Sequence, residues 1–223
     1  MMQFEGARPA LGDAYVLILE TIKVGIYMPC SRLDEIDLAE RFGVSRTPVR
    51  AVLQRVQTQN LLTCVGPSLI VASLDHYQMA ELYVVRTELE GLTTRLAAKH
   101  ALHEEVKVLQ QMVDGDRSSE NDANALSSTN RRFHKKLYLA SHNRFLVGQL
   151  DLLYRLMVLL AMTSLAVVER GLVALDEHQA ILTTNKEKDG GVAYAAVKAH
   201  NIETKLFKHR HYVPIASANF SKR

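Results

Sequence analysis

Residues 38–50 read LAERFGVSRTPVR, and this stretch decides the fold of the N-terminal part of the chain. Apolar residues at helical spacing precede Gly43, which is expected to end the first helix. A second helix is predicted to begin after Ser45, which is placed to cap it. Pro48 fits the first turn of that helix, where a backbone N–H has no intrahelical partner. Two short helices joined by a tight turn are typical of a helix-turn-helix that enters the DNA major groove.

The second helix carries the residues predicted to contact DNA. Its first turn is polar and basic, and residues 41–55 contain four arginines and no acid. Arginine suits contact with phosphates and with guanine edges. The predicted contacts are Ser45, Arg46, Thr47 and Arg50. The alternative is an ordinary helical hairpin with a solvated charged face.

The flanking segments complete a winged helix-turn-helix. Asn60 can adopt the left-handed conformation that ends a helix, and β-prone runs on both sides of Gly66-Pro67-Ser68 predict a hairpin. The predicted elements are helices over 9–27, 33–42 and 45–59 and strands over 61–65 and 69–72. We therefore expect the winged domain to span residues 1–74.

Beyond residue 74 the pattern predicts helices alone. Asp189-Gly190-Gly191 is a strong break between the last two of them. The expected helices cover about 75–100, 103–114, 122–140, 143–169, 171–187 and 191–211. The predicted fold class is therefore mainly α, with an N-terminal winged helix-turn-helix, an all-helical bundle of about six helices over residues 75–213 and a tail over 214–223.

Composition indicates a cytoplasmic protein with no membrane partner. The chain has 223 residues, enough for two domains, and a net charge of only +3. Its two cysteines have no metal-type spacing, and no signal peptide is evident. The longest uncharged apolar segment, 156–168, is too short to cross a bilayer and is expected to form a buried core helix.

A second group of residues suggests a metal site. Asn130 and His134 are four residues apart, so they share one face of a predicted helix. His178 and His200 would lie about 33 Å apart in one continuous helix, but the break at Gly190-Gly191 allows two antiparallel helices. Three histidines and an oxygen donor could then converge and bind zinc, nickel or another divalent transition metal. The alternative is that these are surface or satisfied core groups, because the chain has nine histidines.

The sequence resembles the GntR family of transcriptional regulators, in the FadR branch whose C-terminal helical ligand-binding domain is called FCD. The resemblance covers residues 10–211 or so. Its N-terminal motifs are Arg32-Leu33, Leu38-Ala39-Glu40, residues 43–50 and Leu53. Its C-terminal motifs are Arg86-Thr87-Glu88-Leu89-Glu90, Arg132-Phe133-His134, Ser141-His142-Asn143, Glu177-His178-Gln179-Ala180-Ile181 and Ala199-His200. It implies a homodimeric DNA-binding regulator, expected to be a repressor, that responds to a small organic or sugar acid.

The resemblance also implies roles for individual residues. Arg32 joins the predicted DNA contacts. His134, His178 and His200 match three of the family's metal ligands, with zinc the first expectation and nickel the second. Arg86 matches an arginine that holds a carboxylate effector, a task suited to bidentate pairing. The alternative for Arg86 is a surface ion pair with Glu90, four residues later.

Three departures from the family pattern bear on these roles. Asn130 stands where relatives have aspartate, which removes a negative charge from the metal site. The wing segment 65–69 is about one residue short and lacks a basic tip, which puts its contact with DNA in doubt. Ile36 occupies a position where many relatives have arginine.

Two other classes of function fit part of the pattern. A metal-dependent hydrolase could use the three histidines, with Glu177 as base, but neighbouring helical residues point about 100° apart, so Glu177 is not expected to share the cavity. A helical interaction module could use DNA only as an anchor. The favoured prediction is a regulator that is not an enzyme.

Overall fold

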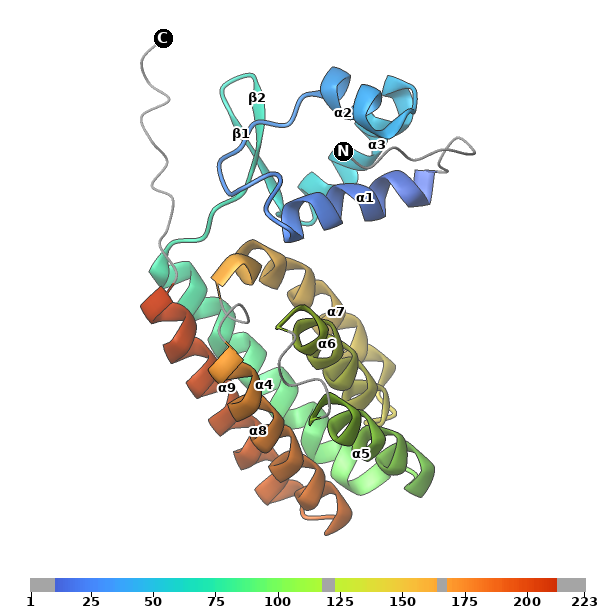
Figure 1. Cartoon of the computed structure of the whole chain (residues 1–223), viewed down its shortest axis with the longest axis vertical. Helices are drawn as coiled ribbons and strands as arrows, with labels where there is room; N and C mark the ends of the chain where they lie inside the picture. Colours follow the sequence, from blue (N-terminus) through green and yellow to red (C-terminus); the bar gives the residue numbers. More distant parts are fainter. Residues whose placement is uncertain (1–10, 118–122, 164–167, 212–223) are drawn as a thin grey trace. The chain divides into compact units, whose positions relative to one another are not determined.

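The computed structural model describes residues 11–117, 123–163 and 168–211, which form two compact units (Figure 1). The first unit comprises the described residues up to Leu74 together with Arg155–Met162. The second comprises Asp75–Tyr154 and the described residues from Thr163 onward. The tail predicted over 214–223 lies outside the described residues, and the domain boundaries drawn from the sequence remain predictions.

The first unit contains the predicted helix-turn-helix. Its helices are α1 (Leu11–Lys23), α2 (Glu35–Phe42) and α3 (Arg46–Thr58). Gly43 ends α2 as predicted, with a φ of 65°, and Asn60 follows α3 in the predicted left-handed conformation, with a φ of 59°. Ser45 occupies the N-cap position of α3, but its side chain makes no capping hydrogen bond, so that part of the prediction is wrong. The preceding helix, α2, does have a side-chain cap, because Asp34 accepts a 2.8 Å hydrogen bond from the Ile36 N–H.

A two-stranded wing follows α3. The strands β1 (Leu62–Val65) and β2 (Ser68–Val71) pair antiparallel. Val65 pairs directly with Ser68, so the turn consists of Gly66 and Pro67 alone. Gly66 has a φ of 57°, the conformation that a type II′ hairpin requires at this position. On the outer side of β2, Arg32 forms a single bridge with Ile70. The hairpin prediction is confirmed.

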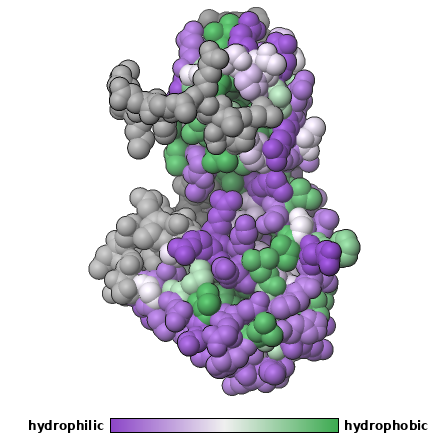
Figure 2. All heavy atoms as spheres, turned by 90° about the vertical axis from the view of Figure 1, so that its right-hand side faces the viewer, coloured by the Kyte–Doolittle hydropathy of each residue, from purple (hydrophilic) through white to green (hydrophobic). Residues whose placement is uncertain are grey.

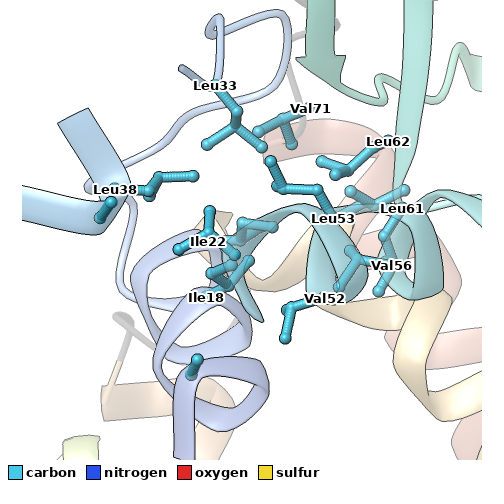
Figure 3. Close-up of a cluster of buried hydrophobic side chains, with 14 residues drawn as sticks. Ile18, Ile22, Leu33, Leu38, Val52, Leu53, Val56, Leu61, Leu62 and Val71 are labelled. Atoms are coloured by element: carbon cyan, nitrogen blue, oxygen red, sulfur yellow. The ribbon is translucent and has the colours of Figure 1, made fainter. Parts of the chain in front are cut away.

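Apolar side chains from every element of the first unit form its core (Figure 3). Ile18 and Ile22 from α1 meet Val52, Leu53 and Val56 from α3, which lie on the apolar side of that helix. Leu159, from far along the chain, is a buried member of the same cluster, and Leu156 and Val158 pack against it. This core fixes α3 so that its opposite side faces outward.

The described part of the second unit is helical, as predicted. Its α-helices are α4 (His76–His100), α5 (His103–Arg117), α6 (Ala123–Leu139), α7 (Arg144–Leu156), α8 (Val168–Lys186) and α9 (Gly190–His211). The helix predicted over 143–169 is not continuous, because α7 ends at Leu156 and the 3₁₀ segment η1 (Met157–Thr163) follows. No helix among the described residues is long and apolar enough to cross a membrane. Hydrophilic residues predominate on the face shown in Figure 2, with apolar ones between them.

Helices α4 and α9 lie side by side and antiparallel (Figure 1). The ring of His76 lies 4.6 Å from that of His209 at one end, and Gly91 faces Tyr194 nearer the other. A Cβ on Gly91 would lie only 2.4 Å from Cε2 of Tyr194, so glycine is what allows this close approach. The packing brings the middle of α4 against the middle of α9, where Glu90 and Asn201 are buried and hydrogen-bonded to each other.

Candidate DNA-binding surface and metal centre

The N-terminal end of α3 presents an exposed polar surface. Ser45, Arg46, Thr47 and Arg50 are all exposed, while the apolar side of the same helix is buried. The side chains of Arg46 and Arg50 are 60% and 59% exposed. Arg32 is also exposed, and its guanidinium lies 4.0 Å from Asp34. The arrangement leaves every predicted contact residue accessible to a nucleic acid.

An acid on α2 pairs with two of these arginines. Glu35, the first residue of α2, accepts hydrogen bonds from Nε of Arg50 at 3.0 Å and from Nη2 at 2.9 Å. Nη2 of Arg46 lies 3.6 Å from the same carboxylate. The hydrogen bond from Arg50 and the charges of both arginines lower the pKa of Glu35. Glu35 lies outside the acid-free window of residues 41–55, so that window gave no sign of the contact.

The two other departures in this unit can be located. Ile36 is 49% exposed, so an apolar side chain lies on the surface at the second position of α2. The wing turn of Gly66 and Pro67 contains no charged residue. Any DNA contact by this turn would therefore use backbone groups.

The second unit brings the three predicted histidines together. His134 on α6, His178 on α8 and His200 on α9 are buried, and one ring nitrogen of each lies within 4.8 Å of the others. The Nε2 atoms of His134 and His178 are 3.3 Å apart. Three converging imidazoles are a donor set that suits zinc or a neighbouring divalent transition metal. Asn130 is half-buried one turn before His134, and its role as a fourth ligand remains a prediction.

Two side chains next to the cluster orient its rings. Oε2 of Glu177 lies 2.6 Å from Nδ1 of His200, and Phe133 stacks on His178 with ring centroids 4.1 Å apart. A carboxylate on one imidazole nitrogen fixes the tautomer and leaves the other nitrogen available for a metal. Glu177 is thus outside the group of three histidines, as expected, but the sequence gave no sign that it would bind the outer nitrogen of His200 on the next helix.

Arg86 and Glu90 form an ion pair, but the pair is not at the surface. Nε of Arg86 donates to Glu90 at 3.0 Å, and the two residues are 4% and 0% exposed. The Glu90 carboxylate also accepts from the Tyr138 hydroxyl and, at 2.6 Å, from Nδ2 of Asn201. Burial opposes the charge of Arg86, yet the Glu90 carboxylate and the surrounding tyrosines hold the pKa of Arg86 well above its ordinary value. The surface reading is thus wrong.

A buried lysine lies near this network. Lys208 on α9 is 6% exposed and follows Asn201 by seven residues, so the two lie on one face of the helix. Burial, together with the positive charge of Arg86, lowers the pKa of Lys208 to about 7. Among the described residues, Arg86 and Lys208 thus place two basic groups in the interior beside the Glu90 carboxylate. Lysine is common near helix ends, so sequence gave little reason to place this one inside.

Comparisons with known proteins agree with this architecture. A model of the FCD domain matches residues 81–203, and a model of the bacterial regulatory proteins of the gntR family matches residues 12–67. The HTH-type transcriptional regulator YdhC of Bacillus subtilis, itself uncharacterized, is 29% identical over 190 residues, 83% of this chain and 85% of that protein.

Solved structures share the fold. The structure of Escherichia coli McbR/YncC superposes with a TM-score of 0.73 at 21% identity, over 90% of this chain and 99% of that one. A metal-free FCD domain superposes with a TM-score of 0.53 at 18% identity, over 62% of this chain and 96% of that one.

Proposed function

Because the chain belongs to the GntR family of bacterial transcriptional regulators and carries an FCD domain, we propose that it is a repressor released from DNA by a small carboxylate. Its relatives are transcriptional regulators and not enzymes, so the hydrolase alternative has no support. A homodimer would bind a palindromic operator with one recognition helix in each of two major grooves about one turn apart. A bacterial regulator of this kind acts on the chromosome, in the cytoplasm.

The observation that carries the DNA-binding proposal is the exposed basic end of α3 above a buried apolar side. Arg32, Ser45, Arg46, Thr47 and Arg50 would contact phosphates and base edges. The experiment is to select fragments of the source genome with purified protein and sequence them. A shared palindrome supports the proposal, whereas fragments without a common sequence contradict it.

The FCD domain would hold a divalent metal and the effector. His134, His178 and His200 would bind the metal, with Asn130 or water completing the shell. The metal and Arg86 would together bind one carboxylate. Release from DNA requires that the effector bind one arrangement of the dimer more tightly than the other.

We expect untagged protein to contain about one divalent metal per chain, since three buried imidazoles converge in the second unit. Elemental analysis after incubation with zinc or nickel checks this. His178→Ala should lose the metal, whereas His142→Ala should keep it, because His142 is exposed and pairs with Glu105. Wild-type protein without metal after incubation would contradict the site.

Two variants test the residues around the metal. Asn130→Asp supplies the family's negative charge and should tighten metal binding in a chelator competition. Glu177→Gln removes the charge on the outer nitrogen of His200 and should weaken metal binding by about 10–100-fold. No gain from Asn130→Asp would remove Asn130 from the ligand set.

In a screen of small organic and sugar acids, at least one compound should raise the melting temperature of the protein, because a ligand that binds only the native state stabilises it. The increase should shrink sharply in metal-stripped protein and in Arg86→Lys, which keeps the charge but not the bidentate geometry. It should also be smaller at pH 8 than at pH 6, because Lys208, with a pKa of about 7, is then largely neutral.

Arg95→Ala is the matched control for the effector screen, since Arg95 is an exposed arginine on the same helix. That variant should keep the full ligand-induced increase. If the acid raises the melting temperature of Arg86→Lys as much as that of the wild type, Arg86 does not bind the effector.

A further inference from the structure

Glu35 is placed to influence both arginines of the recognition helix. It is the first residue of α2, and its carboxylate is shared by Arg50, at 2.9 Å and 3.0 Å, and by Arg46, at 3.6 Å. The arginines come from successive turns on one side of α3. One carboxylate thus links the two helices of the motif at the surface that would face DNA.

The ion pair contributes little to the stability of the fold. Its arginines are more than half exposed, and exposed ion pairs are weak because water and salt screen them. The core of the first unit, which includes Leu38 and Ala39 of α2 as well as the apolar side of α3, already fixes these two helices. We therefore expect Glu35 to affect DNA binding by the two arginines more than the stability of the fold.

A carboxylate at this place has two consequences for DNA binding. Glu35 accepts hydrogen bonds from two nitrogens of the Arg50 guanidinium and so holds it in one orientation. An arginine held in this way favours those bases whose acceptor atoms fit that orientation. The negative charge also offsets one of the two positive charges, which weakens attraction to phosphates of any sequence. The first effect raises the affinity for the preferred DNA sequence relative to other sequences, and the second lowers the affinity for every sequence.

We propose that Glu35 is a specificity-determining residue, which orients Arg50 and Arg46 for the operator and weakens binding to unrelated DNA. The inference rests on the proposed function as a DNA-binding regulator. It adds that discrimination between sequences depends on an acid that itself needs no contact with a base.

The experiment compares Glu35→Gln with Asp37→Asn in the full chain. Both variants remove one negative charge from α2, but Asp37 is exposed and none of the described arginines pairs with it. Dissociation constants are measured for the selected operator fragment and for a scrambled fragment of equal length over a series of salt concentrations.

Glu35→Gln should bind the scrambled fragment more tightly and with a steeper salt dependence. Its ratio of operator to scrambled affinity should fall about tenfold, the lower end of what one bidentate contact contributes to discrimination. Asp37→Asn should change both affinities by the same factor and keep the ratio.

The outcomes separate this inference from the function on which it rests. If the ratio in Glu35→Gln equals that in Asp37→Asn, or exceeds that of the wild type, the role of Glu35 is overturned while operator binding stands. If the wild type itself shows no preference for the operator fragment, the proposed function fails and the inference with it.

Discussion

Replacing Glu90 with alanine is expected to lower the free energy of unfolding by about 3–5 kcal/mol, because it leaves a buried charge unpaired. Arg86 is 4% exposed, and its Nε hydrogen bond to Glu90 would be lost. The Tyr138 hydroxyl and the Asn201 amide would lose their acceptor as well. Urea unfolding of the full chain measures the change, followed as a shift of the transition midpoint.

Two comparison variants isolate the buried pair. Glu203→Ala removes an exposed acid from α9 and should stay within about 0.5 kcal/mol of wild type. The double change Arg86→Met with Glu90→Leu replaces both charges by apolar groups and should cost less than Glu90→Ala alone. A loss below about 1 kcal/mol for Glu90→Ala would show that the network contributes little to folding.

Replacing Arg46 with alanine should weaken operator binding by about 1–3 kcal/mol, the usual loss of a good bidentate base contact. Arg46 begins α3, and its side chain is 60% exposed, so the fold does not depend on it. A gel-shift titration on the selected operator at fixed salt measures the loss.

Arg55→Ala is the matched control for Arg46→Ala. Arg55 carries the same charge in the last turn of the same helix, where its guanidinium lies 4.1 Å from the centre of the Tyr15 ring. We expect a much smaller effect on operator binding from this variant. If Arg46→Ala binds the operator with wild-type affinity, Arg46 does not contribute to the DNA interface.

The features that sequence predicted well have strong local signals. Gly43, Asn60 and Gly66 adopt the left-handed conformations expected of residues that end helices or form tight turns. The Gly190-Gly191 break correctly allowed α8 and α9 to bring His178 and His200 together. The left-handed residue between α8 and α9 is Lys188, with a φ of 56°, and Gly190 begins α9, so the break lies just before the two glycines.

The features that sequence missed depend on which side of an element is buried. On α4 the apolar Val84 and Val85 are exposed while the charged Arg86 and Glu90 are inside, the reverse of the usual pattern. Spacing identified Arg86 and Glu90 as neighbours but could not show that Asn201 and Tyr138 complete a buried network around them. Likewise, the contact of Glu35 with α3 depends on the angle between α2 and α3, which the spacing of residues in the sequence does not give.

The short 3₁₀ segment after α7 limits how this protein can be taken apart. Leu159 completes the core of the first unit, with Leu156 and Val158 packed beside it, although they lie more than 80 residues beyond Leu74 in the chain. A fragment that ends at Leu74 would carry the complete helix-turn-helix and wing but expose the apolar surface that these three side chains cover. The N-terminal residues are therefore expected to be less stable alone than in the full chain, because the first unit is completed by a segment that follows most of the second one in the sequence.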